Sequence, residues 1–307
     1  MSAATKFIPA GTPSKIATRR GPCDSPEVTQ RSRLIRAASV AFDKYEGLGN
    51  DFVVIDAANE DAIDLDAARA ICDRRFGVGA DGVLLVLPPR DSKNVARMRV
   101  VNADGSIPEM CGNGLRCVAL HVARTRGNGS GVYETDAGLR ECNVEKTDDE
   151  TLVAVDMGIV KSLGPKIVEV DGEEIEVRIG DAGNPHAVIF RSVDEAIPIH
   201  RGVDRLGPRI EKHRDFPDGI NVNFALFDRR KPTELHLVVW ERGVGRTLAC
   251  GTGACATVAV GCDTGLLEWA TPTKIHLPGG TLEITVEHSG ACKMRGPARH
   301  VFSGKIP

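Results

Sequence analysis

The chain has few aromatic side chains and no long apolar segment, and both absences narrow its class. Aromatic residues make up 4% of the 307 residues, which argues against the stacking platforms that hold single-stranded nucleic acid. No run of about 18 apolar residues occurs, so no membrane-spanning helix is expected. The formal net charge is −3, and a nucleic-acid partner is not expected because such proteins carry a broad basic face.

The nine cysteines lack the patterns of a disulfide framework or a zinc site. Their number is odd and the chain has no signal-peptide core, which argues against a secreted disulfide scaffold. No Cys-x-x-Cys pair is present, so we predict no metal site. Cys72, Cys255 and Cys262 lie on apolar helical stripes and are interpreted as core residues.

Residues 1–40 differ in composition from the rest of the chain. They hold seven Lys or Arg, two acidic residues and nine Ser or Thr. One interpretation is a disordered extension or a start site assigned too far upstream. The other is an organelle transit peptide, which is also rich in Arg and Ser and poor in acids. Residues 1–43 are therefore left out of the fold, and the predicted location is the cytoplasm, or the plastid stroma if the leader is a transit peptide.

From Lys44 onward, strand patterns outnumber helical ones. Short apolar or alternating runs occur at 52–55, 83–86, 152–156, 174–179, 187–190, 235–240 and 281–286. Helical patterns follow the capping residue Asp64 and recur over 115–122 and 255–262. Many strands without regular β-α-β alternation predict an α+β fold.

One segment matches a nucleotide-binding motif in the wrong context. Residues 77–82 read Gly-Val-Gly-Ala-Asp-Gly, but a helical pattern precedes them and a strand pattern follows. The dinucleotide fingerprint needs the reverse order. These glycines are better explained by a helix-to-strand turn.

A short cysteine turn occurs twice, one domain length apart. Residues 110–114 read Met-Cys-Gly-Asn-Gly and residues 249–253 read Ala-Cys-Gly-Thr-Gly, each followed by a helical pattern. This echo indicates two similar halves, each with Cys-Gly-x-Gly at a helix N-terminus. The unpaired N–H groups there favour an anion, so we expect lowered thiol pKa values and a cradle for a carboxylate.

Two such turns facing one another would suit inversion of a stereocentre next to a carboxylate. A thiolate could remove the α-proton from one face while a thiol supplies a proton to the other, and the helix ends would stabilise the developing negative charge. The alternatives at this point are core cysteines or a redox disulfide.

The sequence resembles the diaminopimelate epimerase family from Lys44 to the C-terminus. The resemblance rests on the two cysteine turns, on Arg116-Cys117, and on segments 47–52, 102–106, 183–186, 221–223 and 241–245. It implies two pseudo-symmetric α+β domains, each a mixed or antiparallel barrel-like sheet around a central helix. The expected halves are 44–157, to which 296–307 return, and 158–295.

The resemblance also implies an activity: cofactor-independent epimerisation of LL-2,6-diaminopimelate to the meso form in lysine and peptidoglycan-precursor biosynthesis. It implies that Cys111 and Cys250 are the two bases and that His186 and Glu241 are auxiliary groups, each near one cysteine. A homodimer is compatible with the family. The substrate contacts that it implies are Asn50, Asn102, Gly112, Asn113, Asn184, Asn221, Glu241, Arg242, Gly251 and Thr252.

Residue 82 departs from the family pattern, and two other functions compete with this reading. Several relatives have a Gln that touches substrate where this chain has Gly82, and no contact is assigned there. One rival is a proline-racemase-like enzyme of the same fold; Arg242 and the asparagines favour a substrate with a distal charged group instead. The other is a non-catalytic amino-acid binding protein, against which the presence of both cysteines argues.

Overall fold

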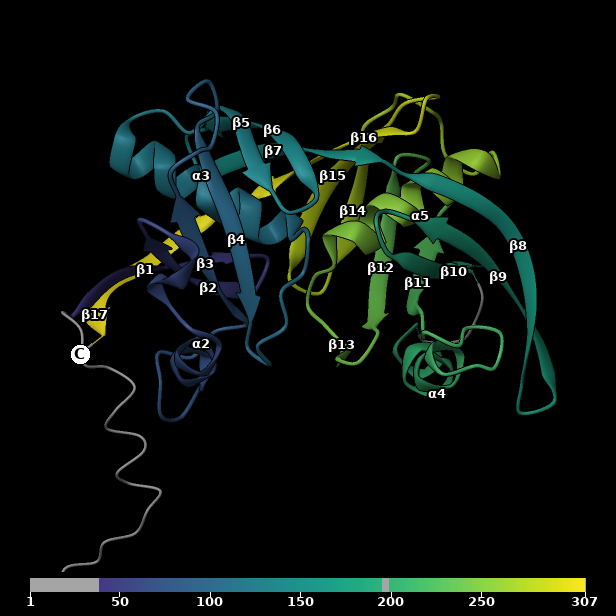
Figure 1. Cartoon of the computed structure of the whole chain (residues 1–307). Coiled ribbons are helices and arrows are strands. Elements are labelled where there is room, and N and C mark those ends of the chain that lie inside the picture. The colour runs from purple at the N-terminus through teal and green to yellow at the C-terminus, as the bar shows by residue number, and fades with distance from the viewer. Residues whose placement is uncertain (1–38, 195–198, 307) are drawn as a thin grey trace, which may run out of the picture. The chain divides into compact units, whose positions relative to one another are not determined.

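The computed structural model describes residues 39–194 and 199–306 (Figure 1). The predicted leader lies outside the described residues up to residue 38. Strand β1 (Val40–Gly47) starts before the expected boundary at Lys44, and its first residue pairs with Ile306 near the chain's other end. Phe42 is buried in this strand. The pairing partner of this first residue is remote in sequence.

Strands dominate the described residues. The helices are α2 (Leu65–Cys72), α3 (Gly112–Arg126), α4 (Ile199–Glu211) and α5 (Gly251–Asp263), with a 3-10 turn η1 at Glu60–Ala62. The other strands are β2 (Asn50–Asp56), β3 (Gly82–Leu87), β4 (Ala96–Asn102), β5 (Gly131–Thr135), β6 (Gly138–Lys146), β7 (Thr151–Ile159), β8 (Lys161–Val170), β9 (Glu173–Asp181), β10 (Pro185–Ser192), β11 (Asn221–Phe227), β12 (Glu234–Glu241), β13 (Gly245–Arg246), β14 (Thr273–Leu277), β15 (Gly280–Val286), β16 (Ala291–Pro297) and β17 (Arg299–Ile306). In this part of the chain, none of the helices is long and apolar enough to span a membrane.

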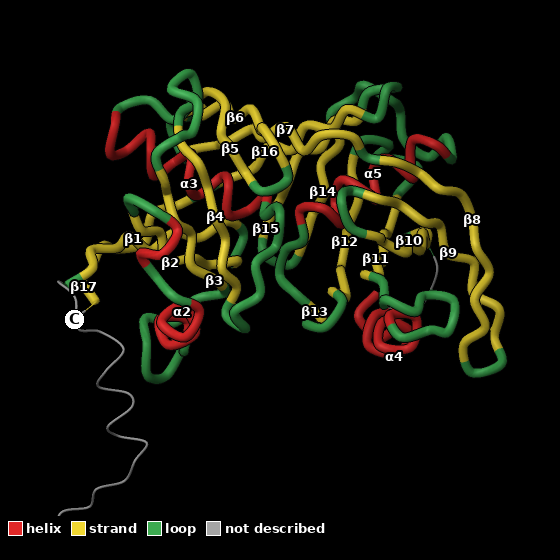
Figure 2. Tube along the Cα trace, viewed as in Figure 1, coloured by secondary structure: helices red, strands yellow, loops and turns green. Residues whose placement is uncertain are grey.

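The same series of strand pairings occurs twice. In the first half β1 to β7 pair in chain order, and β2–β3 and β4–β5 are the parallel pairs. In the second half the series runs β9, β10, β11, β12, β14, β15 and β16, and its parallel pairs β10–β11 and β12–β14 fall at the same steps. A helix follows the corresponding strand in each half: α2 matches α4 and α3 matches α5 (Figure 2). The expected α+β fold of two similar halves is confirmed.

Two long-range pairings close this arrangement. β7 pairs antiparallel with β16, which joins the strands of one half to those of the other. β17 returns to the first half and pairs antiparallel with β1. Residue 157, the expected end of the first half, lies within β7.

Helices α3 and α5 are the buried centres of the two halves (Figure 1). Every residue from Gly112 to Val122 of α3 is buried, and the predicted stripe at 255, 258, 259 and 262 of α5 is buried as well. Gly127 ends α3 in the left-handed conformation that favours glycine, with its N–H bonded to the carbonyl of Ala123. The first residues of both helices, Gly112 and Gly251, are among the buried ones, so both helices begin in the protein interior.

The turn at residues 77–82 follows a helix and precedes a strand, as predicted. Asp64 caps α2 by accepting the N–H of Ala67, and β3 begins at Gly82. Gly77 is tightly enclosed: a Cβ at this position would lie 2.1 Å from the carbonyl oxygen of Ala70. The close approach of the backbone explains why the turn needs glycine.

We predict that Gly77→Ala lowers the free energy of unfolding by about 1–3 kcal/mol, because the added methyl group meets backbone atoms that cannot yield. The control is Gly202→Ala in α4, where the nearest atom to the new Cβ is 3.8 Å away and no loss is expected. Urea unfolding monitored by circular dichroism measures both. Equal stabilities of the two variants would contradict this account of the turn.

Candidate active site

Each of the two predicted cysteines is the N-cap residue of a buried helix. Cys111 precedes α3 and Cys250 precedes α5. The N–H of Gly114 donates to Cys111 Sγ at 3.3 Å. A Cβ at Gly114 would lie 3.2 Å from Cys111 Sγ, and one at Gly253 would lie 3.2 Å from Cys250 Sγ. The last glycine of each Cys-Gly-x-Gly turn thus allows the backbone to approach the sulfur.

The two helix ends meet on either side of Met294. This fully buried side chain comes from β16. Its Cε lies 2.7 Å from the position of a Cβ at Gly112, and its Sδ lies 3.0 Å from that of a Cβ at Gly251. Asn113 Oδ1 is 3.5 Å from the same position at Gly251. The two cysteine turns, 139 residues apart in sequence, are therefore neighbours in the fold.

The expected lowering of the thiol pKa values is wrong. Burial raises the pKa of Cys111 to about 11, and the N–H of Gly114 and the charge of Arg116 offset only part of this rise. Burial also raises the pKa of Cys250, with a further rise caused by the carboxylate of Glu241. The helix ends do favour the thiolates, but desolvation of the charged sulfur is the larger effect.

Glu241 lies beside Cys250 at the end of β12. Thr247 Oγ1 donates to Glu241 Oε1 at 2.5 Å, and the carboxyl group also forms a hydrogen bond with the Cys250 thiol. Burial raises the pKa of Glu241, while these two hydrogen bonds lower it. Its negative charge also raises the pKa of Cys111, although less than burial does.

His186 lies on the Cys250 side of the site and is fully buried. Its Nε2 is 3.0 Å from Asn184 Oδ1 and 3.2 Å from Thr252 Oγ1, which in turn is 3.5 Å from Cys250 Sγ. Its Nδ1 is 3.0 Å from Asn223 Oδ1. Burial lowers the pKa of His186 to about 4, so the ring is neutral at pH 7.

The sequence analysis expected His186 and Glu241 each to lie near one cysteine, and in this geometry both lie on the Cys250 side. Glu241 bonds Cys250, and the hydrogen bonds of His186 lead to Thr252 on the same helix end. Among the described residues, no hydrogen bond joins His186 to Cys111. The resemblance alone could not fix this assignment, since it depends on how β10 packs against α5.

A chain of amide side chains reaches Cys111 from β2. Asn113 Nδ2 donates to Asn50 Oδ1 at 3.3 Å, and Asn50 Nδ2 donates to Asp81 Oδ2 at 2.6 Å. Asp81 is itself held by Arg74, whose Nη2 donates to its other oxygen at 2.6 Å. Asn50 and Asn113 are thus fixed relative to each other.

Asn221 connects two loops of the second half. Its Nδ2 donates to the carbonyl of Pro185 at 2.9 Å, and its Oδ1 accepts the backbone N–H of Arg242 at 3.0 Å. The guanidinium of Arg242 is exposed and donates to the carbonyls of Asp218 and Gly219. Among the described residues, no hydrogen bond uses its Nε or Nη2, so these donors can bind a carboxylate.

Two positions stand apart from this network. Asn102 Nδ2 donates to Ser106 Oγ at 2.9 Å in its own turn, and no hydrogen bond in the described part of the chain joins its side chain to the other candidates. Gly82 pairs with Asn102 in the β3–β4 ladder. A Cβ at Gly82 would lie 2.9 Å from the carbonyl of Val101, so a larger side chain there needs β4 to shift.

Several residues that hold the candidates in place received no role in the sequence analysis. They are Asp81, Arg116, Asn223, Thr247 and Met294. Asn223 is fully buried, and its Nδ2 donates to the carbonyl of Gly253 and to Thr257 Oγ1 in α5. An asparagine in an otherwise apolar strand is a signal that could have been read. Met294 and Thr247 carry no comparable signal.

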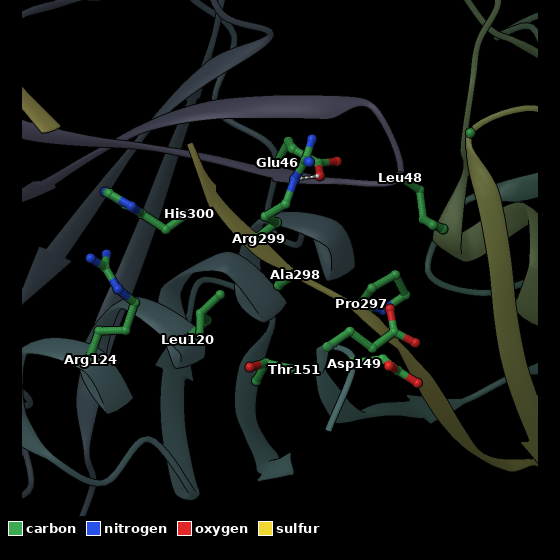
Figure 3. Close-up of a pocket in the computed structure, with 12 residues that line it drawn as sticks. Glu46, Leu48, Leu120, Arg124, Asp149, Thr151, Pro297, Ala298, Arg299 and His300 are labelled. Carbon is green, nitrogen blue, oxygen red and sulfur yellow. Dashed lines mark hydrogen bonds and ion pairs between the residues drawn. The ribbon is translucent and has the colours of Figure 1, made fainter. Parts of the chain in front are cut away.

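A separate cavity of about 440 Å³ lies behind α3 (Figure 3). Its walls come from β1, α3, β17 and the loop before β7, and include Leu120, Arg124, Thr151, Arg299 and His300. Neither cysteine lines it. Cys250 and Asn113 are each 5% exposed, whereas Cys111 is partly exposed.

Comparison with known proteins gives consistent results along most of the chain. A family model described as diaminopimelate epimerase matches residues 42–163 and 178–301. A diaminopimelate epimerase of Desulfitobacterium hafniense is 43% identical over 284 residues, which cover 86% of this chain and 96% of the relative. That of Methanothermobacter thermautotrophicus is 40% identical over 289 residues, covering 86% and 98%.

Solved structures of more distant proteins share the fold. A hydroxyproline epimerase from Agrobacterium vitis superposes with a TM-score of 0.67 at 16% identity, over 87% of this chain and 92% of that one. A probable proline racemase from Agrobacterium radiobacter gives 0.66 at 15% identity, over 87% and 93%. A PhzF-family phenazine biosynthesis protein from Bacillus anthracis gives 0.67 at 15% identity, over 88% and 100%.

We predict that His186 makes stability depend on pH between about 6.5 and 4. The unfolded histidine binds a proton below about 6.5, whereas the folded one does so only near 4. The free energy of unfolding should therefore decrease as the pH is lowered through this window, by up to about 1.4 kcal/mol per pH unit. Urea unfolding at pH 7, 6 and 5 should show a shallower dependence for His186→Gln. Parallel curves for the two proteins would contradict the buried neutral ring.

Proposed function

Because the chain belongs to the diaminopimelate epimerase family, we propose that it interconverts LL- and meso-2,6-diaminopimelate with Cys111 and Cys250 as the two bases. The observation that carries this proposal is the meeting of the two cysteine-capped helix ends across Met294. Inversion needs a proton removed from one face of the α-carbon and another delivered to the opposite face. Two sulfurs on neighbouring helix ends can supply both.

The reacting carboxylate binds the first N–H groups of the two helices. Gly112 and Asn113 begin α3, and Gly251 and Thr252 begin α5. A carboxylate between these ends receives hydrogen bonds and the favourable field of both helix dipoles. The same groups stabilise the negative charge that grows on this carboxylate as the α-proton leaves.

The two thiols differ in how readily they ionise. Cys111 accepts N–H groups of its own helix and lies near the charge of Arg116. Cys250 faces the carboxylate of Glu241, which raises its pKa further. Cys111 is therefore the base in one direction of the reaction and Cys250 the acid, with the roles reversed in the other direction. Glu241, bonded to Cys250, accepts or returns the proton of that thiol.

The distal amino-acid group of the substrate binds the polar residues of the second half. Arg242 holds its carboxylate with the donors not used by the carbonyls of Asp218 and Gly219. Asn221 positions the backbone of Arg242, and Asn184 and Asn50 supply acceptors for the ammonium group. Asn102 belongs to this set by family resemblance.

Other features of the enzyme stay predictions from sequence. These are the absence of a cofactor, a homodimeric state, and a location in the cytoplasm or, with a transit peptide, in the plastid stroma. The domain limits 44–157 and 158–295 also stay predictions.

We predict that Cys111→Ala and Cys250→Ala each reduce epimerisation by about 100–10,000-fold, the usual contribution of a positioned acid or base. Cys262→Ala, which removes a buried thiol further along α5, should keep activity. The assay follows the loss of optical rotation and the uptake of solvent deuterium with LL-diaminopimelate. Near-normal rates in either catalytic variant would exclude the two-base scheme.

The same assay separates the rival functions. A binding protein leaves the α-hydrogen of diaminopimelate unexchanged, and a proline-racemase-like enzyme exchanges L-proline in preference. Either result with the wild-type protein would refute the proposed function.

We predict that Arg242→Met raises KM for diaminopimelate by about 10–100-fold with a smaller change in kcat, because a hydrogen bond to a charged group contributes about 1.5–3 kcal/mol. Arg246→Met is the control, since this exposed side chain pairs with Asp204 instead. Steady-state kinetics on both variants test the assignment. An unchanged KM in Arg242→Met would place the distal carboxylate elsewhere.

A further inference from the structure

Arg116 is a buried cation in the second turn of α3, the helix that Cys111 caps. It lies on α3, has no exposed surface, and is among the largest fully buried side chains of the described residues. The proposed reaction invokes its charge near Cys111 but assigns it no contact within the site. A guanidinium stays charged in proteins, so its burial places a positive charge close to the site.

The hydrogen bonds of Arg116 go to neutral atoms. Its Nη1 donates to Asn113 Oδ1 at 2.9 Å and lies 3.6 Å from Met294 Sδ, and its Nε donates to the carbonyl of Pro297 at 3.2 Å. Its Nη2 is buried and has no hydrogen-bond partner among the residues that the structure describes. The guanidinium is thus held in position without a negative charge bound to it.

The carboxylate that acts electrostatically on Arg116 already has other partners. Glu46 contributes to the electrostatic surroundings of Arg116, but its Oε1 accepts from Arg299 Nε at 2.9 Å (Figure 3) and its Oε2 accepts the N–H of Gly49. A buried charge without a partner is costly, by several kcal/mol as a rough figure. A negative charge that forms near Arg116 during the reaction would supply the missing partner.

Two charges of this kind arise at the α3 end: the Cys111 thiolate and the carboxylate of the bound substrate. Arg116 and Cys111 already influence each other's ionisation in the substrate-free protein. Arg116 also fixes Asn113. Because Asn113 Oδ1 accepts from Arg116, its Nδ2 is turned toward Asn50. This orientation joins the buried cation to the proposed substrate-binding amides.

We propose that Arg116 is a positioning residue of the epimerase: its charge stabilises the Cys111 thiolate, and its fixed fork orients Asn113 toward substrate. This inference rests on the proposed role of Cys111. The geometry carries it, because a buried guanidinium without a carboxylate partner among the described residues bonds Asn113 of the Cys111 turn and lies 3.6 Å from Met294 Sδ between the two turns.

Other ionisable groups act on the same pair. Glu241, at the end of β12, opposes the thiolate of Cys111. The groups that face Arg116 itself are Cys111, Cys117, Cys255 and Glu46. Loss of the Arg116 charge removes the cation from this set, so the pKa of Cys111 should rise and its thiolate should become rarer at a given pH.

The test compares Arg116→Lys with Arg116→Met, two unbranched side chains of similar length that differ in charge. Cys111 in the substrate-free protein is alkylated with iodoacetamide at pH 9 and quantified by peptide mass spectrometry. We expect Arg116→Met to react about tenfold more slowly than Arg116→Lys, as a shift of about one pH unit implies. Arg116→Lys should stay within about threefold of wild type. Arg124→Met, on the exposed part of α3, is the control and should match wild type.

Kinetics add a second readout. Both Arg116 variants should raise KM for diaminopimelate, because neither provides the fork that holds Asn113, and only the Met variant should also lose kcat. Equal alkylation rates of Cys111 in the Lys and Met variants would overturn the proposal. If Arg116→Met does not fold, Arg116→Gln takes its place as the neutral variant. A tenfold lower alkylation rate of Cys111 in Arg116→Lys than in wild type would overturn the proposal on its own.

Deuterium uptake by the wild-type protein distinguishes a failure of the role of Arg116 from a failure of the proposed function. If wild type exchanges the α-hydrogen while the Lys and Met variants alkylate alike, only the role of Arg116 fails. If wild type does not exchange it, the proposed function fails, and the alkylation rates still report whether Arg116 acts on the sulfur.

Discussion

The structure depends on two buried helices, each at the centre of one half, whose N-termini lie at the same place. A helix end leaves backbone N–H groups without internal partners, and water cannot reach them easily when the helix is enclosed. In α3 and α5 a cysteine sulfur and glycine-flanked backbone occupy this end. Since Met294 touches both ends, the unpaired donors of two halves converge on one small volume, which suits an anionic ligand.

Local patterns in the sequence were enough to predict the elements that create this geometry. The stripe Leu115, Val118, Ala119 and Val122 and its counterpart in α5 marked the two central helices, and the repeated Cys-Gly-x-Gly placed both of their starts. The pairing of β7 with β16 and of β17 with β1 could not be predicted from these patterns. Those contacts join residues far apart in sequence, and alternation along a strand does not name its partner.

The site was predicted less completely than the fold, because burial is a property of the assembled chain. The helix dipole alone suggested acidic thiols, yet the enclosure of Cys111 reverses the direction of its pKa shift. The position of His186 next to Thr252 and of Asn223 beneath it depends on how β10 and β11 pack against α5. Single residues such as Met294 acquire their meaning only from that packing.

Burial also strengthens the effect of the unequal charges around the two sulfurs. In a dry site each nearby charge acts strongly, so small differences in placement separate two otherwise similar thiols. Cys111 has a cation behind it, whereas Cys250 has a carboxylate beside it. The two halves repeat the same fold, and the departure from symmetry at Arg116 and Glu241 allows one sulfur to hold a proton while the other gives its proton up.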